Sequence, residues 1–306
     1  MNRLVAIVGP TGTGKSRLAL RLAQAFHGEI VSADSRQICR HMDIGVAKPT
    51  TVELSLVPHH LIDIINPDED FSLAQYQQLA YAAIKDIQQR QRLAILVGGS
   101  GLYVWSVVEG WRIPPVAPAL EYRQDLEKRA AGVGREELYR ELERVDSSAA
   151  EKIGRHNVRR IIRALEVYYS SGTPFSRLQK KETPAFNTLI IGLTTERKEL
   201  YRRIDARIDL MVEQGLVEEI KRLVDMGYHL DLPAMSSIGY RQIGLFLRGE
   251  TTREEAVRHV KFATNRLIRH QYNWFQLTDK RIQWFDIRKD IDAEVINLVA
   301  EFIGAE

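Results

Sequence analysis

Residues 9–16, Gly9-Pro10-Thr11-Gly12-Thr13-Gly14-Lys15-Ser16, form the stretch that decides the fold of this 306-residue chain. They match the phosphate-binding loop pattern, in which two glycines separated by four residues are followed by lysine and a hydroxyl residue. Residues 4–8 before them are apolar and partly β-branched, which predicts a buried strand. Residues 15–25 after them place apolar side chains at helical spacing. The stretch therefore joins a strand to the N-terminus of a helix.

A loop in this position is suited to binding phosphate. Unpaired backbone N–H groups and the positive end of the helix dipole attract phosphate oxygens. Glycines let the backbone close around the anion without a Cβ in the way. Lys15 would reach the outer phosphates, and the Ser16 hydroxyl would ligate Mg²⁺. The loop thus indicates a polyphosphate ligand, but not which one or what is done with it.

Composition narrows the class of protein. Charged residues make up 27% and hydrophobic residues 44% of the chain, as in ordinary globular proteins, and the length suffices for two domains. The net charge of +3 is compatible with nucleic-acid binding without indicating it. The single cysteine, Cys39, excludes an intrachain disulfide and a cysteine-based zinc site. No apolar run is long enough to cross a membrane, and the first strand leaves no room for a signal peptide, so we expect a cytoplasmic protein.

Further strands alternate with helices along the first hundred residues. Apolar runs at residues 29–33, 60–65 and 93–97 predict strands, and a Ser72–Gln75 capping box predicts a helix that ends near residue 90. Such alternation implies a parallel sheet covered on both faces, with its ligand at the carboxyl ends of the strands. We therefore predict an α/β fold, a P-loop NTPase-like parallel sheet flanked by helices. The phosphate-binding loop, Asp34 and residues 98–103 should all lie at that edge.

The pattern changes in the middle of the chain. Strands disappear after residue 113, and helices are predicted at residues 120–130, 135–144 and 157–170, with a Ser148–Glu151 capping box between them. Strand character returns at residues 188–193. We therefore predict an inserted all-helical domain at residues 113–182. The core would comprise residues 1–112 and 183–306, and its last part, after residue 200, is predicted to be mostly helical.

Asp34 is the second informative residue, because it ends a predicted strand at the ligand edge. Its carboxylate could bind Mg²⁺ or accept a proton, or it could merely cap the next turn. A nucleotide hydrolase would need a metal-binding aspartate after another strand, but residues 93–97 are followed by Gly98-Gly99, and Asp63 is a weaker substitute. The hydrolase interpretation is thereby weakened. The loop could equally hold a diphosphate that departs in the reaction.

Two basic clusters allow two interpretations each. Arg159, Arg160 and Arg163 share one side of the helix predicted at residues 157–170. They would form either a solvated face, which is the usual case, or phosphate contacts to nucleic acid. Arg203 and Arg207 are one helical turn apart with aspartates interleaved, so they would form either intrahelical salt bridges or a clamp on a charged leaving group.

A third basic face lies near the C-terminus. A helix at residues 262–276 would place Arg266, Arg269 and Asn273 on one side. Its packing side would carry Ala263, Leu267 and Trp274.

Taken together, the motifs resemble those of the tRNA dimethylallyltransferases over nearly the whole chain. They comprise residues 9–16, Asp34-Ser35-Arg36-Gln37, residues 42–49, 58–63, 98–103, 159–166 and 239–242, and Gln271 with Trp274-Phe275. The resemblance implies transfer of a dimethylallyl group from dimethylallyl diphosphate to N6 of adenosine 37 in tRNA. It implies that Asp34 is the catalytic base, that Thr11 lines the reaction channel, and that Arg207 binds the diphosphate together with the loop and Mg²⁺ on Ser16.

The resemblance also implies tRNA contacts and a monomeric enzyme. The contacts map onto Asp34, Ser35, Arg36, Gln37, Ser100, Arg123, Arg159, Arg160, Ile161, Ile162, Arg163, Ser236, Ser237, Ile238, Gly239, Tyr240, Arg241, Arg269, His270, Gln271 and Trp274. His270 and Gln276 depart from the family's basic residues. The alternatives are an adenylate isopentenyltransferase acting on free AMP, ADP or ATP, which would not need the helical insert, and a P-loop kinase.

Overall fold

The computed structural model describes residues 2–113, 120–131, 134–178, 181–184 and 186–304. Its contacts divide the chain into two compact units, one made of Met1–Val108 with Pro184–Glu306 and the other of Glu109–Thr183. The helical insertion predicted at residues 113–182 falls within the second unit. No helix of the described residues has an apolar stretch that could cross a bilayer.

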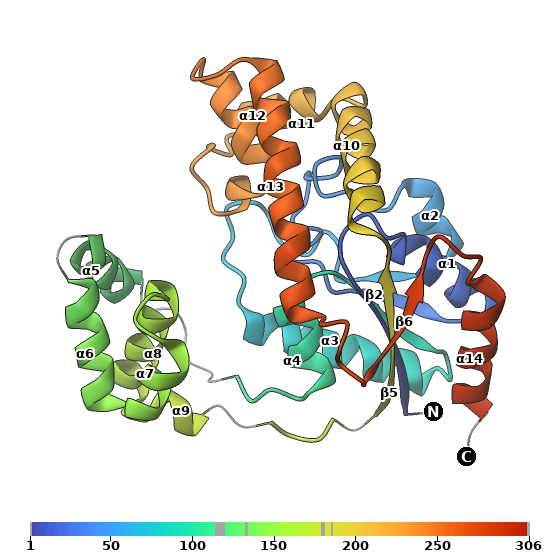
Figure 1. Cartoon of the computed structure of the whole chain (residues 1–306), viewed down its shortest axis with the longest axis horizontal. Coiled ribbons are helices and arrows are strands. Elements are labelled where there is room, and N and C mark those ends of the chain that lie inside the picture. The colour runs from blue at the N-terminus through green and yellow to red at the C-terminus, as the bar shows by residue number, and fades with distance from the viewer. Residues whose placement is uncertain (1, 114–119, 132–133, 179–180, 185, 305–306) are drawn as a thin grey trace. The chain divides into compact units, whose positions relative to one another are not determined.

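The first unit is built on a six-stranded sheet in the order β3-β2-β4-β1-β5-β6 (Figure 1). All neighbouring strands pair in parallel, which confirms the predicted α/β fold with helices flanking a parallel sheet. The strands are β1 (Arg3–Val8), β2 (Glu29–Ser32), β3 (His59–His60), β4 (Ala94–Val97), β5 (Asn187–Thr194) and β6 (Ile282–Asp286).

The strand predicted at residues 60–65 is wrong beyond its first residue. β3 ends at His60, because Leu61 and Asp63 have φ angles of 63° and 56°, which an extended strand does not contain. The Asp63 carboxylate lies 2.6 Å from Nζ of the largely buried Lys48, and this ion pair holds the turn in place. The apolar residues after His60 thus belong to a loop.

β6 was not predicted, because the region after residue 200 was expected to be mostly helical. It pairs with β5 from Ile190↔Ile282 to Thr194↔Asp286. The sequence does contain a usable pattern here, since Ile282-Gln283-Trp284-Phe285 is a β-branched and aromatic run between two polar turns. Because this run is short, the helical pattern of the surrounding residues outweighed it in the prediction.

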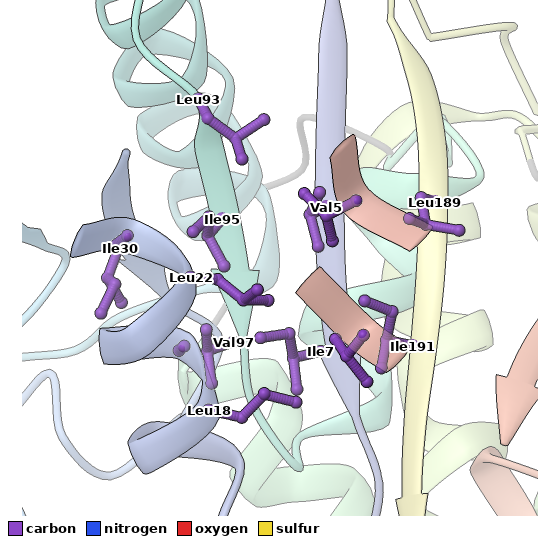
Figure 2. Packing of buried hydrophobic residues seen from close by; sticks show 14 of the residues in the cluster. Val5, Ile7, Leu18, Leu22, Ile30, Leu93, Ile95, Val97, Leu189 and Ile191 are labelled. Carbon is purple, nitrogen blue, oxygen red and sulfur yellow. The ribbon is translucent and has the colours of Figure 1, made fainter. Parts of the chain in front are cut away.

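Helices cover both faces of this sheet. α1 places Leu18 and Leu22 against Val5, Ile7 and the residues that share their face, as Figure 2 shows. Val295 of α14 joins the same cluster. On the other face, α3 contacts β2 and β4. The helices of this unit are α1 (Lys15–Ala25), α2 (Thr51–Leu56), α3 (Leu73–Gln89), α4 (Gly101–Val108), α10 (Arg197–Glu213), α11 (Leu216–Asp225), α12 (Tyr240–Leu247), α13 (Arg253–Trp274) and α14 (Asp292–Gly304).

Helix boundaries follow local capping chemistry in most places. Ser72 caps α3, and Gln75 returns the hydrogen bond, which confirms the predicted capping box. The predicted Ser148–Glu151 box is wrong: α7 (Ser147–Ile153) is capped by Asp146, whose carboxylate accepts a hydrogen bond from the Ala149 N–H. Asp146 also accepts hydrogen bonds from the backbone and side chain of Ser176, so a residue outside the local sequence fixes the start of this helix.

The second unit has a core of its own. Buried residues from four of its helices form one cluster, with Leu126, Leu142, Ile161 and Leu165 among its fully buried members. Its helices are α5 (Leu120–Ala131), α6 (Arg135–Val145), α7 (Ser147–Ile153), α8 (Val158–Ser171) and α9 (Phe175–Leu178).

Candidate active site

One cavity of about 340 Å³ lies among segments of the first unit that are far apart in the chain. The phosphate-binding loop, the Asp34–Gln37 segment and Gly98-Gly99 contribute to its lining, as the carboxyl-end argument predicts. Val46, Ala47 and Pro49, in the loop between β2 and α2, and Arg203 and Arg207 of α10, the helix after β5, also line it. Residues predicted to bind diphosphate and the predicted base thus line the same space.

The phosphate-binding loop has the geometry that its glycines allow. Gly9, Gly12 and Gly14 have φ angles of 130°, 84° and 85°, which side-chain-bearing residues rarely adopt. A Cβ on Gly12 would also lie 2.8 Å from Cδ1 of Ile204. Gly14 precedes α1 without any side-chain cap, so the N–H groups of the first helical turn remain available for an anion.

Lys15 closes the loop on itself. Its ammonium donates a hydrogen bond to the Pro10 carbonyl oxygen at 2.8 Å. Burial lowers the pKa of Lys15 to about 8, with Asp34 opposing that decrease and Arg207 adding to it. The side chain is therefore still mostly charged at neutral pH, and a phosphate arriving beside it would stabilise that charge.

The two arginines of α10 have different partners. Arg203 donates to Glu199 at 2.8 Å, one turn earlier on the same helix. Arg207 reaches the phosphate-binding loop, where its Nη1 lies 3.5 Å from Oγ1 of Thr11, and burial lowers its pKa while Asp34 opposes that effect. The interleaved aspartates do not pair with these two arginines in the described chain: Asp209 binds Lys261 at 2.7 Å, and Asp205 has a buried oxygen without a partner.

Asp34 caps a turn and also lies at the cavity. Its Oδ1 accepts a hydrogen bond from the Arg36 N–H at 2.9 Å, so it does cap a turn. It also lines the cavity, close enough to affect the pKa values of Lys15 and Arg207. The cap fixes the orientation of the carboxylate, and the second oxygen is available to a ligand.

No group of three or more histidine, cysteine, aspartate or glutamate residues arranged for a metal ion occurs in the part of the chain that the structure describes. Asp63, the weaker candidate for a metal ligand, is paired with Lys48 and does not line the cavity. Ser16 does line it, at the start of α1. Mg²⁺ commonly binds through one or two protein ligands together with substrate phosphates, and this donor set suits that mode.

Comparisons with known proteins identify the family of this chain. A family model described as IPP transferase matches residues 37–278. A tRNA dimethylallyltransferase of Roseiflexus sp. (strain RS-1) is 48% identical over 302 residues, which make up 99% of each chain. The chain belongs to the tRNA dimethylallyltransferase family. As a member of this family it is a transferase enzyme with tRNA dimethylallyltransferase activity.

Solved structures support the same assignment. A tRNA isopentenylpyrophosphate transferase from Bacillus halodurans is 41% identical with a TM-score of 0.72, covering 98% of this chain and 96% of that one. A eukaryotic dimethylallyltransferase described as acting on tRNA is 26% identical with a TM-score of 0.85, covering 99% of this chain and 80% of that one. The six-stranded parallel sheet flanked by helices is thus the fold of the family's known structures.

Gln271, which the family resemblance assigns to tRNA, has an internal role in this dimethylallyltransferase. Its Oε1 accepts a hydrogen bond from the Thr11 N–H at 2.9 Å, and its Nε2 donates to the Gly99 carbonyl oxygen at 3.1 Å. A side chain on Gly99 would collide with this amide, and one on Gly101 would collide with Trp274. Gln271 therefore ties α13 to two loops of the cavity, a role that no pattern in the sequence indicates.

The packing side predicted for α13 is only partly right. Ala263 and Trp274 are half-buried, but Leu267 is exposed. The buried residues near them are Val260, Ile268 and Gln271. The exposed side keeps Arg266, Arg269, His270 and Asn273. The basic character of this face thus survives the correction.

The other contacts predicted in the first unit divide into exposed and internal residues. Arg36, Ser236 and Arg241 are exposed, whereas Tyr240 is fully buried and Ser237 nearly so. Ser35 and Ser100 bind each other, with their hydroxyl oxygens 3.2 Å apart. Gln37 lines the cavity and donates a hydrogen bond to the Ala47 carbonyl oxygen. Ile238 is half-buried, and Gly239 directly precedes α12. A surface for tRNA would therefore use the exposed members.

The predicted contacts in the second unit divide in the same way. Arg159 and Arg160 are exposed, whereas Ile161 and Ile162 belong to the helical core. Arg163 and Arg123 bind the fully buried Glu166 at 2.7 and 2.9 Å. Burial acts to raise the pKa of Glu166, but hydrogen bonds from the two arginines leave it lowered overall. This carboxylate therefore holds two of the predicted contact residues in fixed positions.

Proposed function

We propose that this enzyme transfers the dimethylallyl group of dimethylallyl diphosphate to N6 of adenosine 37 in tRNA and releases diphosphate. The observation that carries the proposal is the single cavity lined by the phosphate-binding loop, Arg207 and Asp34. A kinase or hydrolase would need a metal-binding aspartate after another strand, whereas β4 is followed by Gly98-Gly99. Asp34 lies beside the loop and is held by a turn, and a carboxylate in that position suits proton transfer.

Asp34 acts as the general base in this proposal. The exocyclic amine of adenine is a weak nucleophile, so removal of its proton as the C–N bond forms lowers the barrier. The electron pair of the breaking C–O bond leaves with diphosphate, and negative charge grows on the departing oxygens. The loop amides, Lys15 and Arg207 stabilise that charge, because they surround the space in which the diphosphate would bind before the reaction begins. Thr11 lies between Arg207 and Gln271 and lines the same channel.

Mg²⁺ fits the same site through the Ser16 hydroxyl and the diphosphate oxygens. When bound, the ion would neutralise part of the charge on the leaving group. Every other contribution comes from the chain itself: the loop holds the diphosphate, Gln271 keeps the loop closed, and Asp34 takes up the proton. We propose a monomer as the active species.

Exposed basic residues supply the tRNA contacts in this proposal. Arg159 and Arg160 lie on α8, and Arg36, Arg241 and Arg269 lie on the first unit. An adenine in a structured loop must leave its stack before its N6 can be reached, which costs a few kcal/mol. Phosphate contacts from these side chains would offset that cost.

Mass spectrometry of the acceptor tests the proposal. Purified enzyme with dimethylallyl diphosphate and Mg²⁺ is given either unmodified tRNA or AMP. We expect the tRNA to gain the mass of one dimethylallyl group at adenosine 37 and AMP to remain unchanged. Prenylated AMP would favour the adenylate isopentenyltransferase instead, and consumption of ATP without prenyl transfer would favour a kinase.

The base assignment has its own test. Asp34→Ala should reduce transfer by about 10²-fold or more while tRNA affinity changes little, because the carboxylate acts on the proton in transit. A variant with full activity would refute the role of Asp34.

A further inference from the structure

One wall of the cavity is a turn that contains a residue in an unfavourable backbone conformation. Val46, Ala47 and Pro49 line the cavity, and we call residues 43–49 the wall turn. Ala47 has a φ angle of 49°, a left-handed conformation that non-glycine residues rarely adopt. Two backbone hydrogen bonds, from Ala47 to Ile44 and from Lys48 to Asp43, close the turn on itself. Contacts from outside must therefore help to keep it in this form.

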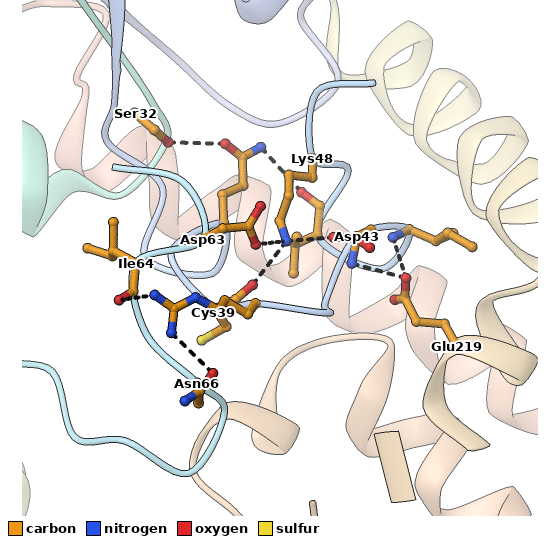
Figure 3. Close-up of polar contacts among 12 residues, drawn as sticks. Ser32, Cys39, Asp43, Lys48, Asp63, Ile64, Asn66 and Glu219 are labelled. Atoms are coloured by element: carbon orange, nitrogen blue, oxygen red, sulfur yellow. Dashed lines mark hydrogen bonds and ion pairs between the residues drawn. The ribbon is translucent and has the colours of Figure 1, made fainter. Parts of the chain in front are cut away.

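Glu219 of α11 supplies the most concentrated of these contacts. Its Oε2 accepts hydrogen bonds from the N–H groups of Asp43 and Ile44 at 3.0 and 2.7 Å. Its Oε1 accepts one from the N–H of Gly45 at 3.2 Å, and Figure 3 shows this carboxylate below the turn. Successive N–H groups that converge in this way usually bind an anion. Here the anion is a side chain of the protein, 1% exposed.

Tyr240 of α12 completes this arrangement. Its hydroxyl donates to Oε1 of Glu219 at 2.6 Å, and the residue is fully buried. Its ring lies so close to Gly45 that a side chain there would collide with it. Tyr240 therefore fixes the carboxylate and also presses on the turn.

The opposite side of the wall turn is held by other groups. Lys48 is 4% exposed and lies 2.6 Å from the carboxylates of both Asp43 and Asp63. Gln37, whose Oε1 accepts from Ser32 at 3.0 Å, donates to the Ala47 carbonyl oxygen at 3.1 Å (Figure 3). The end of the turn near Asp43 is thus attached to α11, and the end that lines the cavity is attached to the sheet.

We infer that Glu219 is a positioning residue for this reaction: it sets the wall turn against which the hydrocarbon part of the donor packs. The inference rests on the proposed function, which supplies the donor. The three backbone contacts of Glu219 all go to the wall turn, and the turn presents Val46, Ala47 and Pro49 to the cavity. The diphosphate part of the donor would lie instead at residues 9–16, which have no hydrogen bond to Glu219.

A comparison of two ligands isolates the hydrocarbon wall. Calorimetry with Mg²⁺ present gives the Kd of dimethylallyl diphosphate and of inorganic diphosphate for each variant. Glu219→Gln places an amide N–H₂ where backbone donors now point, so the turn loses part of its support. We expect its Kd for dimethylallyl diphosphate to rise about tenfold and its Kd for inorganic diphosphate to change less than about twofold.

Two further variants keep the experiment decisive. Tyr240→Phe removes one hydroxyl and leaves the three amide contacts, so the same selective loss should appear at about threefold, even if Glu219→Gln fails to fold. Glu218→Gln, on the exposed neighbour in α11, should change neither Kd.

The possible results distinguish a failure of this inference from a failure of the proposed function. Equal weakening of both ligands, or unchanged affinities in a folded Glu219→Gln or Tyr240→Phe protein, would overturn the role of Glu219. If the wild-type protein binds dimethylallyl diphosphate no better than inorganic diphosphate and prenylates no acceptor, the proposed function itself fails.

Discussion

Two helices of this protein carry closely spaced arginines, and the structure treats them differently. In α10, Arg203 binds Glu199 on its own helix, while Arg207 points at the phosphate-binding loop and has only a long contact, of 3.5 Å, to Thr11. In α8, Arg163 is bound to the buried Glu166 together with Arg123 of α5, while Arg159 and Arg160 are exposed.

The difference shows that a buried carboxylate determines which arginines of a cluster are bound inside the protein. A carboxylate out of water needs cations, so Glu166 takes the arginines that can reach it. Among the described residues no carboxylate forms such an ion pair with Arg207: Asp34 opposes the decrease in its pKa but accepts its hydrogen bond from the Arg36 backbone. A half-satisfied guanidinium inside a cavity suits an anionic ligand, whereas a satisfied one stabilises the fold.

Arg207→Ala tests the difference between the arginines and should have the largest effect on activity. We expect kcat/KM for dimethylallyl diphosphate to fall about 10²–10³-fold, because a preorganised cation is lost where charge develops. Arg203→Ala is the matched control on the same helix and should cost less than about fivefold. Steady-state kinetics on both variants checks this, and equal losses would contradict the division between the two arginines.

Glu166→Gln tests the arginines that a buried carboxylate binds in the second unit. Replacing the charge between two arginines by a neutral amide should lower the free energy of unfolding of the second unit by about 2 kcal/mol. Hydrogen exchange of the α8 amides in the full chain measures this. Activity with saturating substrates should stay near that of the wild type, and a loss of activity without faster exchange would show that Glu166 serves the reaction.

Lys15 gives the phosphate-binding loop of the first unit a pH dependence in the mildly alkaline range. Its pKa is lowered to about 8 in the free protein, so above that pH the ammonium is lost and the diphosphate is bound less well. We expect kcat/KM for the donor to fall up to about tenfold per pH unit above pH 8. Lys15→Arg stays charged, so its profile should lack this decrease even if its rate is lower. The same decrease in Lys15→Arg would assign it to another group.

Neutralising the exposed arginines of α8 should have the smallest effect. Arg159→Ala with Arg160→Ala should weaken tRNA binding about five- to tenfold at moderate salt and reduce the salt slope by up to about two. Filter binding over a range of salt concentrations measures both. Arg140→Ala with Arg144→Ala, on α6 of the same unit, provides a control of equal charge. Unchanged affinity would mean that Arg159 and Arg160 are only a solvated face.

Much of the fold could be predicted from local patterns. The phosphate-binding loop with its strand and helix, the parallel sheet and the helical character of the insert all depend on periodicity and on short motifs. The errors came from contacts across the chain. The ion pair with Lys48 holds Asp63 in a turn rather than in a strand. Asp146 rather than Ser148 caps α7. β6 forms a strand because it pairs with the edge of β5.

The site was predictable in part for the same reason. The phosphate-binding loop could be selected from its motif, and Asp34 and Arg207 from position together with the family resemblance; Thr11, Gly12, Gly14, Lys15 and Ser16 of the loop line one cavity with Asp34 and Arg207. Gln271 and Glu219 could not, because their roles depend on carbonyl and N–H groups of distant loops that no spacing along the chain reveals. Residues that hold a site in shape are therefore the ones that the sequence leaves hidden.

The account depends most on the claim that donor and acceptor meet between the phosphate-binding loop and Asp34. The direct measurement is a crystal structure with an unreactive thio-analogue of dimethylallyl diphosphate and an unmodified anticodon stem-loop. We predict the diphosphate on the Gly9–Ser16 loop and the N6 atom of adenosine 37 within hydrogen-bonding distance, about 3 Å, of the Asp34 carboxylate. An adenine bound elsewhere, with Asp34 contacting only the Arg36 backbone, would contradict the account.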